Sequence, residues 1–167
     1  DECPAPDFVK VDVQGAELDI FTHGMKKLSE VIIIESEVEF IRLYKEQPLF
    51  SEVEMFLREQ GFVFHKFLDL NSRMIRPMKA PNILSGVSQV LWADAIFVRG
   101  FPEFESYTNE QLIKGATLLN DIYLSYDMAN LMLKKLDENG ATDFSDTYMN
   151  VLSQATGVAR YMSNIME

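Results

Sequence analysis

The sequence is poor in the residues that build disulfides and metal sites. Its 167 residues include one cysteine, Cys3, and two histidines, His23 and His65, which lie far apart. A single thiol cannot close an internal disulfide, and these three side chains do not have the spacing of a zinc site. We therefore expect no metal centre, and a reducing, cytoplasmic setting.

Long apolar runs and a leader segment are missing as well. The longest purely apolar stretch is residues 31–34, whereas a membrane-spanning helix needs about 20 such residues. No signal-peptide pattern is present. The chain begins Asp-Glu-Cys-Pro rather than with Met. We expect a soluble chain with no membrane partner, taken from the later part of a longer protein.

Positive charge is also scarce. The chain has 15 Lys and Arg against 26 Asp and Glu, a net charge of −11. Nucleic-acid backbones and anionic membranes both require a positive footprint, so the composition argues against either as the main partner. The hydrophobic share of 47% is that of a globular protein, and the length is enough for one real core.

What is present in the first hundred residues is an alternation of strands and helices. The pattern predicts strands over residues 8–13, 31–38, 62–70 and 90–99, and helices over residues 16–22 and 51–60. Gly24 is expected to end the first helix, with His23 as a cation at its C-terminus. This order is typical of a parallel sheet that ends in an antiparallel hairpin.

The pattern changes after Gly100. Thr108 and Gln111 form a capping-box signature, and apolar residues then recur at helical spacing to about residue 136. A second helix is expected from Ser145 to about residue 165. The two would form an α-helical hairpin, so we expect two domains, residues 1–100 and residues 101–167.

Carboxylates gather where the predicted strands end. Alternation places Lys10 and Asp12 on one face of the first strand, and Glu35 and Glu37 lie late in the second. Open α/β sheets bind ligands beyond the carboxyl ends of their strands. An Asp12–Glu35 pair could hold a proton, a cation or a substrate hydroxyl. The alternatives are structural: Asp12 could tie down the Gly15 turn, and the glutamates could simply face water.

Several strings of residues resemble one enzyme family. They are Lys10-Val-Asp-Val-Gln-Gly-Ala-Glu17, Ile34-Glu-Ser-Glu-Val38, Tyr44-Lys-Glu-Gln-Pro-Leu-Phe50 and Leu91-Trp-Ala-Asp-Ala-Ile-Phe-Val-Arg99. Together they are similar to the FkbM-type S-adenosylmethionine-dependent methyltransferases over residues 6–100. The resemblance implies the last four strands of a Rossmann-like class I methyltransferase sheet, followed by the helical hairpin. The implied fold class is α/β.

The resemblance also implies roles for individual residues. Asp12, Glu35 and Glu37 would be catalytic, and Asp12, Val13, Gln14 and Gly15 would contact the cofactor, S-adenosylmethionine. Tyr44 would line the substrate side. Independently of the resemblance, Arg73, Arg76 and Lys79 make residues 71–89 a basic loop without an acid. We expect this loop to cover the active site or to hold an anionic part of the substrate through Arg73 and Arg76; a merely solvated loop is the alternative. The acceptor would be a small molecule or a sugar- or lipid-like compound, methylated at oxygen.

The glycine-rich turn with which the family cradles its cofactor does not occur in this sequence. We therefore interpret the chain as the carboxyl-terminal half of a methyltransferase, inactive on its own. The alternative is a non-catalytic interaction module, acting through an exposed first strand or through the hairpin. An aromatic and Met stripe on the hairpin is expected to be packed, with homodimerisation as the second possibility; its residues are Tyr123, Tyr126, Met128, Met132 and Tyr148.

Overall fold

The computed structural model describes residues 4–79, 81–82, 85–140 and 142–155. The chain divides into two compact units, residues 1–100 and residues 101–167. In the described part of the chain, no helix is both long enough and apolar enough to cross a membrane.

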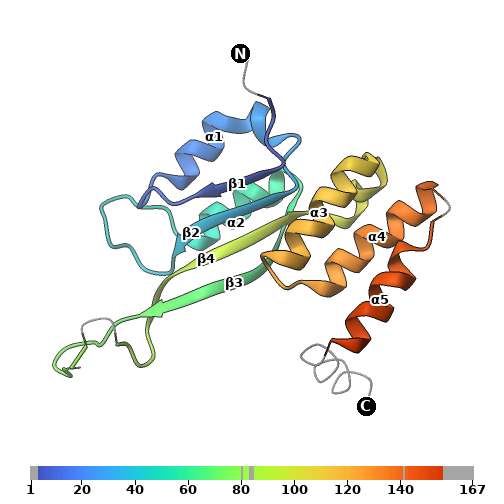
Figure 1. Cartoon of the computed structure of the whole chain (residues 1–167). Coiled ribbons are helices and arrows are strands. Elements are labelled where there is room, and N and C mark those ends of the chain that lie inside the picture. The colour runs from blue at the N-terminus through green and yellow to red at the C-terminus, as the bar shows by residue number, and fades with distance from the viewer. Residues whose placement is uncertain (1–3, 80, 83–84, 141, 156–167) are drawn as a thin grey trace. The chain divides into compact units, whose positions relative to one another are not determined.

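The first unit is a four-stranded sheet with two helices (Figure 1). Its elements in chain order are β1 (Phe8–Val11), α1 (Glu17–Leu28), β2 (Ile33–Glu39), α2 (Phe50–Glu59), β3 (Phe62–Ser72) and β4 (Val90–Arg99). The strand order is β1-β2-β4-β3, with β1 parallel to β2 and β4 antiparallel to both of its neighbours. The expected α/β class and the antiparallel β3–β4 hairpin are confirmed.

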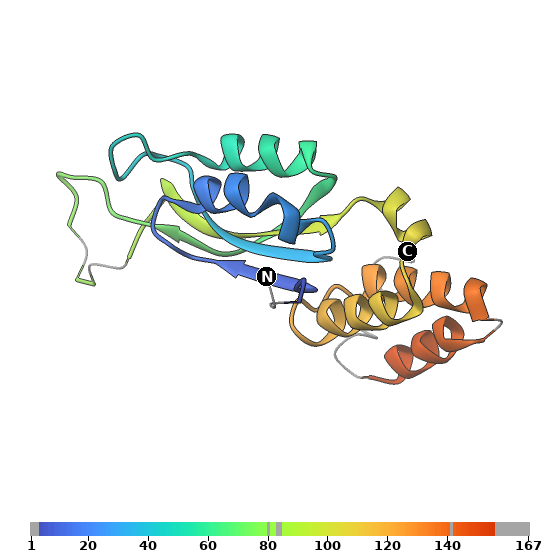
Figure 2. The ribbon, with the colours of Figure 1, turned by 90° about the horizontal axis from the view of Figure 1, so that it is seen from above.

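Both helices cover the same face of this sheet (Figure 2). The chain steps in one direction from β1 to β2 to β3, and right-handed crossovers that step in one direction place their helices on one side. The core lies between these layers, with Ile34, Val38 and Phe97 of the strands against Phe21 of α1 and Leu57 of α2. The residues that alternate with these on the strands form the opposite face, which carries the acids.

The first helix extends beyond its predicted end. α1 runs through Gly24 to Leu28, so the predicted stop at Gly24 was wrong, and His23 lies inside the helix rather than at its C-terminus. A Cβ built on Gly24 would meet no atom within 4 Å. Gly24 therefore lowers the stability of α1 relative to a better helix former, and no turn requires a glycine at this position.

The second unit contains the short 3₁₀ helix η1 (Phe101–Ser106) and three α-helices. These are α3 (Asn109–Asp121), α4 (Tyr126–Gly140) and α5 (Phe144–Gln154). The capping box is confirmed, because the Thr108 hydroxyl accepts from the Gln111 backbone N–H at 3.2 Å. The single helix predicted over residues 108–136 was wrong, because the chain breaks between α3 and α4. Residues 156–165 of the predicted last helix lie outside the described residues.

A buried carboxylate of α4 supports the start of α5. Asp137 accepts hydrogen bonds from the backbone N–H groups of Phe144 and Ser145, each at 2.9 Å, and from the Thr142 hydroxyl at 2.6 Å. Burial alone would raise the pKa of the Asp137 carboxyl, but these hydrogen bonds outweigh it and lower that pKa. The N-terminus of α5 is thus capped from a neighbouring helix.

Candidate functional site

The candidate site lies at the end of the sheet where β1, β2 and β3 finish. Figure 1 shows the loop after β2 and the loop between β3 and β4 leaving from this same end. The two loops cover residues 40–49 and 73–89. The topology therefore brings together the strand-end acids, the Gly15 turn and the loops that carry Tyr44, Arg73 and Arg76.

The strand register decides which acids face each other. Lys10 is the Cα partner of Glu35, and Glu37 is the Cα partner of Asp94 on β4. The Lys10 ammonium forms an ion pair and hydrogen bond with the Glu35 carboxylate, and its Nζ lies 4.0 Å from Asp94 Oδ2. Lys10 thereby neutralises the buried Glu35.

Asp12 is joined to Glu37 rather than to Glu35. The Gln14 side-chain amide Nε2 donates to Asp12 Oδ1 at 2.9 Å and to Glu37 Oε2 at 2.8 Å. One amide nitrogen carries two hydrogens, so it can serve both carboxylates at once. Gln14 reaches this position from a backbone with φ of 59°, in the left-handed region.

Three acids on this face bind protons more readily than usual. Burial, together with the charges of Asp12, Glu17 and Asp94, raises the pKa of the Glu37 carboxyl to about 7. Burial and the charges of Glu17 and Glu37 raise the pKa of the Glu39 carboxyl to about 7 as well. For Asp94, burial also raises the pKa, against the opposing charge of Lys10.

The turn that carries Gln14 is held by Glu17, which is 1% exposed. Its two carboxylate oxygens accept the backbone N–H groups of Val13 and Gly15, each at 2.9 Å. Gly15 has a φ of 112°, and a Cβ built on it would lie 3.0 Å from Gln47 Nε2. Glu17, an acid in the first turn of α1, thus also closes the turn before that helix.

Gln47 ties the loop after β2 to the same turn. Its Oε1 accepts the backbone N–H groups of Leu43 at 2.9 Å and Tyr44 at 3.2 Å. Its Nε2 is buried and has no hydrogen-bond partner among the described residues. A buried amide donor without a partner is costly. Holding the loop through Leu43 and Tyr44 therefore leaves this buried donor without a partner among the described residues.

The four predicted cofactor contacts divide into two kinds. Asp12 and Gln14 have exposed side chains at the end of β1. Val13 and Gly15 have their N–H groups bonded to Glu17, so these two donors are already used. The chemistry available to a ligand at this turn comes from carboxylate and amide side chains, not from backbone donors.

The predicted substrate residues lie on the loops of this end. Tyr44 is 57% exposed, and Arg76 is exposed too. The Arg73 guanidinium stacks over the Trp92 ring, with its Cζ 4.5 Å from the ring centroid. Trp92 is the Cα partner of Glu39 in the sheet, so Arg73 lies beside the acids of β2. These acids, Glu35, Glu37 and Glu39, form the acid row.

The sequence analysis missed Glu39 and left Asp94 without a role. Both were detectable by alternation, because Glu35, Glu37 and Glu39 share one face of β2 and Asp94 sits across from Glu37. Among the described residues, no group of three His, Cys, Asp or Glu side chains is arranged to hold a metal ion. Asp12 and Glu37 are therefore joined through Gln14, whereas Glu35 is paired with Lys10.

Comparison with known proteins identifies the first part of this unit. No curated protein and no solved structure matches the chain. The family model described as the methyltransferase FkbM domain matches residues 3–64, from before β1 into β3, and includes Asp12, Glu35 and Glu37. The resemblance to FkbM-type methyltransferases is thus confirmed for residues 3–64, the segment that is similar to this domain.

Proposed function

We propose that this chain provides the acceptor side of methyl transfer from S-adenosylmethionine, with Glu37 and Asp12 as the pair that takes the acceptor's proton. The observation that carries the proposal is the double hydrogen bond from Gln14 to both carboxylates. These hydrogen bonds hold Asp12 and Glu37 together as a pair, at the end of the sheet where α/β enzymes bind their ligands.

The chemistry requires a base because a neutral hydroxyl is a weak nucleophile. The acceptor oxygen would bond to the methyl carbon as the methyl–sulfur bond breaks and S-adenosylhomocysteine leaves, and the acceptor's proton would move to a carboxylate oxygen of Glu37. A general base works best when its pKa is near the working pH, and the pKa of Glu37 is raised to about 7. Glu35 is less suited to this role because Lys10 already holds it.

The cofactor fits the charge of this end. S-adenosylmethionine supplies an electrophilic methyl group on a positively charged sulfur, and Asp12 with Glu37 would face that charge. The proposed Rossmann-like relation would make β1 to β4 the last four strands of the complete sheet.

The acceptor side would be formed by the two loops. Tyr44 offers a hydroxyl and an aromatic ring to a small-molecule or sugar- or lipid-like acceptor. Arg73 and Arg76 bring the positive charge that the acid row lacks. The pairing of Arg73 with Trp92 holds one guanidinium in place at the rim.

The test is a carboxyl titration of this chain by NMR, with ¹³C-labelled glutamate. We expect the Glu37 signal to titrate with a midpoint of about 7. The midpoint should fall in the Asp12→Asn variant, because a like charge is removed. Glu59, exposed on α2, provides the control: Glu59→Gln should leave the Glu37 midpoint unchanged.

The same variants should be assayed for methyl transfer in a protein that includes the coding sequence upstream of Asp1. Loss of a general base typically costs about 10²- to 10⁴-fold in rate, so Glu37→Gln should lose this much and Glu59→Gln nothing. Normal turnover in Glu37→Gln, or an ordinary Glu37 midpoint, rejects the proposed role. For the present chain alone we expect little or no heat with S-adenosylmethionine in calorimetry.

A second candidate function is supported by the strand order. β1 is an outer strand of the sheet, since among the described strands only β2 pairs with it. An unpaired strand edge can accept a strand from another chain. The alternative to catalysis is therefore an interaction module that binds another chain through this edge. Binding of a partner, together with no methyl transfer, would favour this alternative.

Pairing of two chains through the helical unit also stays a proposal. Tyr123, Met128 and Met132 of the aromatic stripe are buried, so they do not offer a free surface. A dimer would have to use exposed apolar residues such as Leu124 and Val151. Light scattering tests the dimer. A mass of 19.2 kDa, that of the monomer, at all protein concentrations would reject it.

A further inference from the structure

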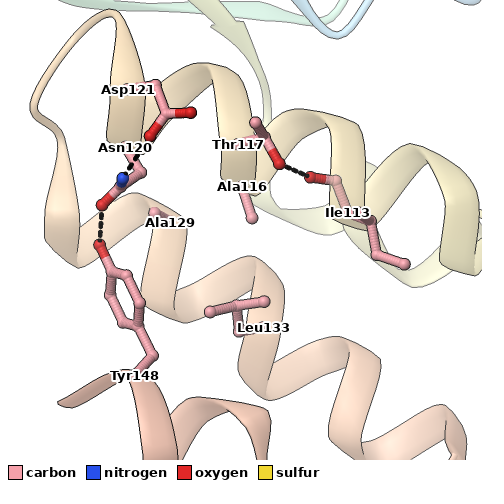
Figure 3. Close-up of a pocket in the computed structure, with 8 residues that line it drawn as sticks. All are labelled: Ile113, Ala116, Thr117, Asn120, Asp121, Ala129, Leu133 and Tyr148. Atoms are coloured by element: carbon pink, nitrogen blue, oxygen red, sulfur yellow. Dashed lines mark hydrogen bonds between the residues drawn. The ribbon is translucent and has the colours of Figure 1, made fainter. Parts of the chain in front are cut away.

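The helical unit has a small pocket between α3, α4 and α5 (Figure 3). Its volume is about 200 Å³, room for roughly seven groups the size of a water molecule. This is the scale of a small organic molecule. Its walls are formed by Ile113, Ala116, Thr117, Asn120, Asp121, Ala129, Leu133 and Tyr148.

One part of the pocket is apolar. Ala116 and Ala129 are buried, and their short side chains leave space that larger residues would fill. Leu133 and Ile113 add branched aliphatic side chains, and Ile113 is 50% exposed. A short aliphatic chain lying here would be removed from water on binding.

The other part is a directed chain of hydrogen bonds. The Tyr148 hydroxyl donates to Asn120 Oδ1 at 2.7 Å, and Asn120 Nδ2 donates to Asp121 Oδ1 at 2.6 Å, as Figure 3 shows. Both donations run toward Asp121, so the chain of bonds ends on a carboxylate. This end of the pocket therefore presents an acceptor with negative charge.

Asp121 occupies a place where a helix disfavours negative charge. It is the last residue of α3, and the last turn of that helix holds no basic residue. The C-terminus of a helix is the negative end of its dipole, so an acid there is unfavourable and a cation favourable. Burial, Tyr126, Asp121 and Asp127 together raise the pKa of Tyr148 to about 12. Among the described residues, those that line the pocket include no Lys, Arg or His.

We propose that this pocket binds a small organic cation, a primary ammonium group with a short aliphatic chain. The ammonium would donate to the Asp121 carboxylate and face the negative end of α3. The aliphatic chain would lie against Ala116, Ala129 and Leu133. The site is separate from the acid pair of the sheet and does not depend on the proposed methyl transfer.

The test is an NMR titration of the whole chain, labelled with ¹⁵N, with butylammonium chloride as the probe and 1-butanol as its neutral equivalent. Butylammonium should give saturable shifts of backbone amides around Ala116, Asn120 and Tyr148. In Asp121→Asn the affinity should fall about tenfold, the size expected when a charged hydrogen bond is lost. The matched control is Asp19→Asn, an exposed acid of α1, which should change nothing.

A second variant tests the apolar contact. In Ile113→Ala, the preference for butylammonium over methylammonium should shrink, because part of the aliphatic wall is gone. Because Ile113 is half exposed, its replacement carries little risk to folding. The proposal is overturned if 1-butanol binds as well as butylammonium. Unchanged affinity in Asp121→Asn, or shifts spread over both units without saturation, would overturn it too.

Discussion

Gln14 and Gly15 form the turn on which the candidate site depends, and both have positive φ, 59° and 112°. The first conformation turns the Gln14 amide toward Asp12 and Glu37. The second brings the backbone against Gln47, which in turn holds the loop after β2. At the scale of single residues, the acid pair is thus a product of backbone conformation as much as of the acids themselves.

A methyl group added at Gly15 should therefore be costly. In Gly15→Ala, a φ of 112° is disfavoured for any L side chain, and the new Cβ would press on Gln47 at 3.0 Å. We expect a loss of about 2 kcal/mol in the free energy of unfolding, within the range for such strain. Urea unfolding followed by Trp92 fluorescence measures it, because the single tryptophan lies in β4 of this unit.

The control is the same substitution at Gly24. Nothing lies within 4 Å of a Cβ there, and the residue is inside α1. Gly24→Ala should stabilise by about 0.5–1 kcal/mol, because alanine is the better helix former. If both variants changed stability in the same direction, the special role of the Gly15 conformation would be wrong.

Some of the site could be predicted from residues alone. Alternation along a strand placed Asp12 with Lys10, and Glu35 with Glu37, on one face. It could not say that Glu37, rather than Glu35, would be joined to Asp12, because register depends on how two strands align in space. The bridge through Gln14 was hidden as well, because its left-handed backbone has no sequence signal when the residue is not glycine.

At the scale of elements, the sheet was easier to predict than the helical unit. The strands are rich in β-branched residues, and β4 has the predicted bounds, Val90–Arg99. The break between α3 and α4 was missed, because Leu119, Tyr123 and Tyr126 continue the helical spacing across it. Neither glycine nor proline marks the break. Instead, Leu124 adopts a φ of 50°.

Leu124 should consequently accept glycine with little loss. The side chain is 62% exposed, so removing it costs little burial, and a left-handed non-glycine residue costs about 1–2 kcal/mol. We expect Leu124→Gly to be more stable than Leu124→Ala by about 1 kcal/mol, since both lose the same side chain but only glycine relieves the backbone. Thermal unfolding followed by circular dichroism at 222 nm compares them. Equal stabilities would show that this turn stores no strain.

At the scale of the whole molecule, negative charge is the dominant property. The net charge is −11, and the acids on the open face of the sheet concentrate part of it. Such an excess opposes compaction through self-repulsion. The fold keeps these acids close by burying some of them and by letting protons remain bound to Glu37 and Glu39.

This arrangement makes stability depend on pH in a direction opposite to that of a salt-bridged protein. The folded pKa values of Glu37 and Glu39 are about 7, above the value of 4.5 for a free glutamate. Between these two pH values the folded chain binds more protons than the unfolded chain, so stability falls as pH rises from about 4.5 to 7. For Glu37 the effect should be smaller than the roughly 1.4 kcal/mol per pKa unit of a fully buried group, because that side chain is only partly buried.

Thermal unfolding between pH 5 and pH 8, followed by Trp92 fluorescence, measures this dependence. The unfolding midpoint should fall with rising pH in the natural chain. Glu37→Gln should remove part of that fall and be the more stable protein at pH 8, because a neutral amide replaces a carboxylate that loses its proton with difficulty. Glu59→Gln removes the same formal charge from an exposed helix position and should leave the slope unchanged. A midpoint that rises from pH 5 to pH 8 would mean that the acids on this face are held by cations rather than by protons.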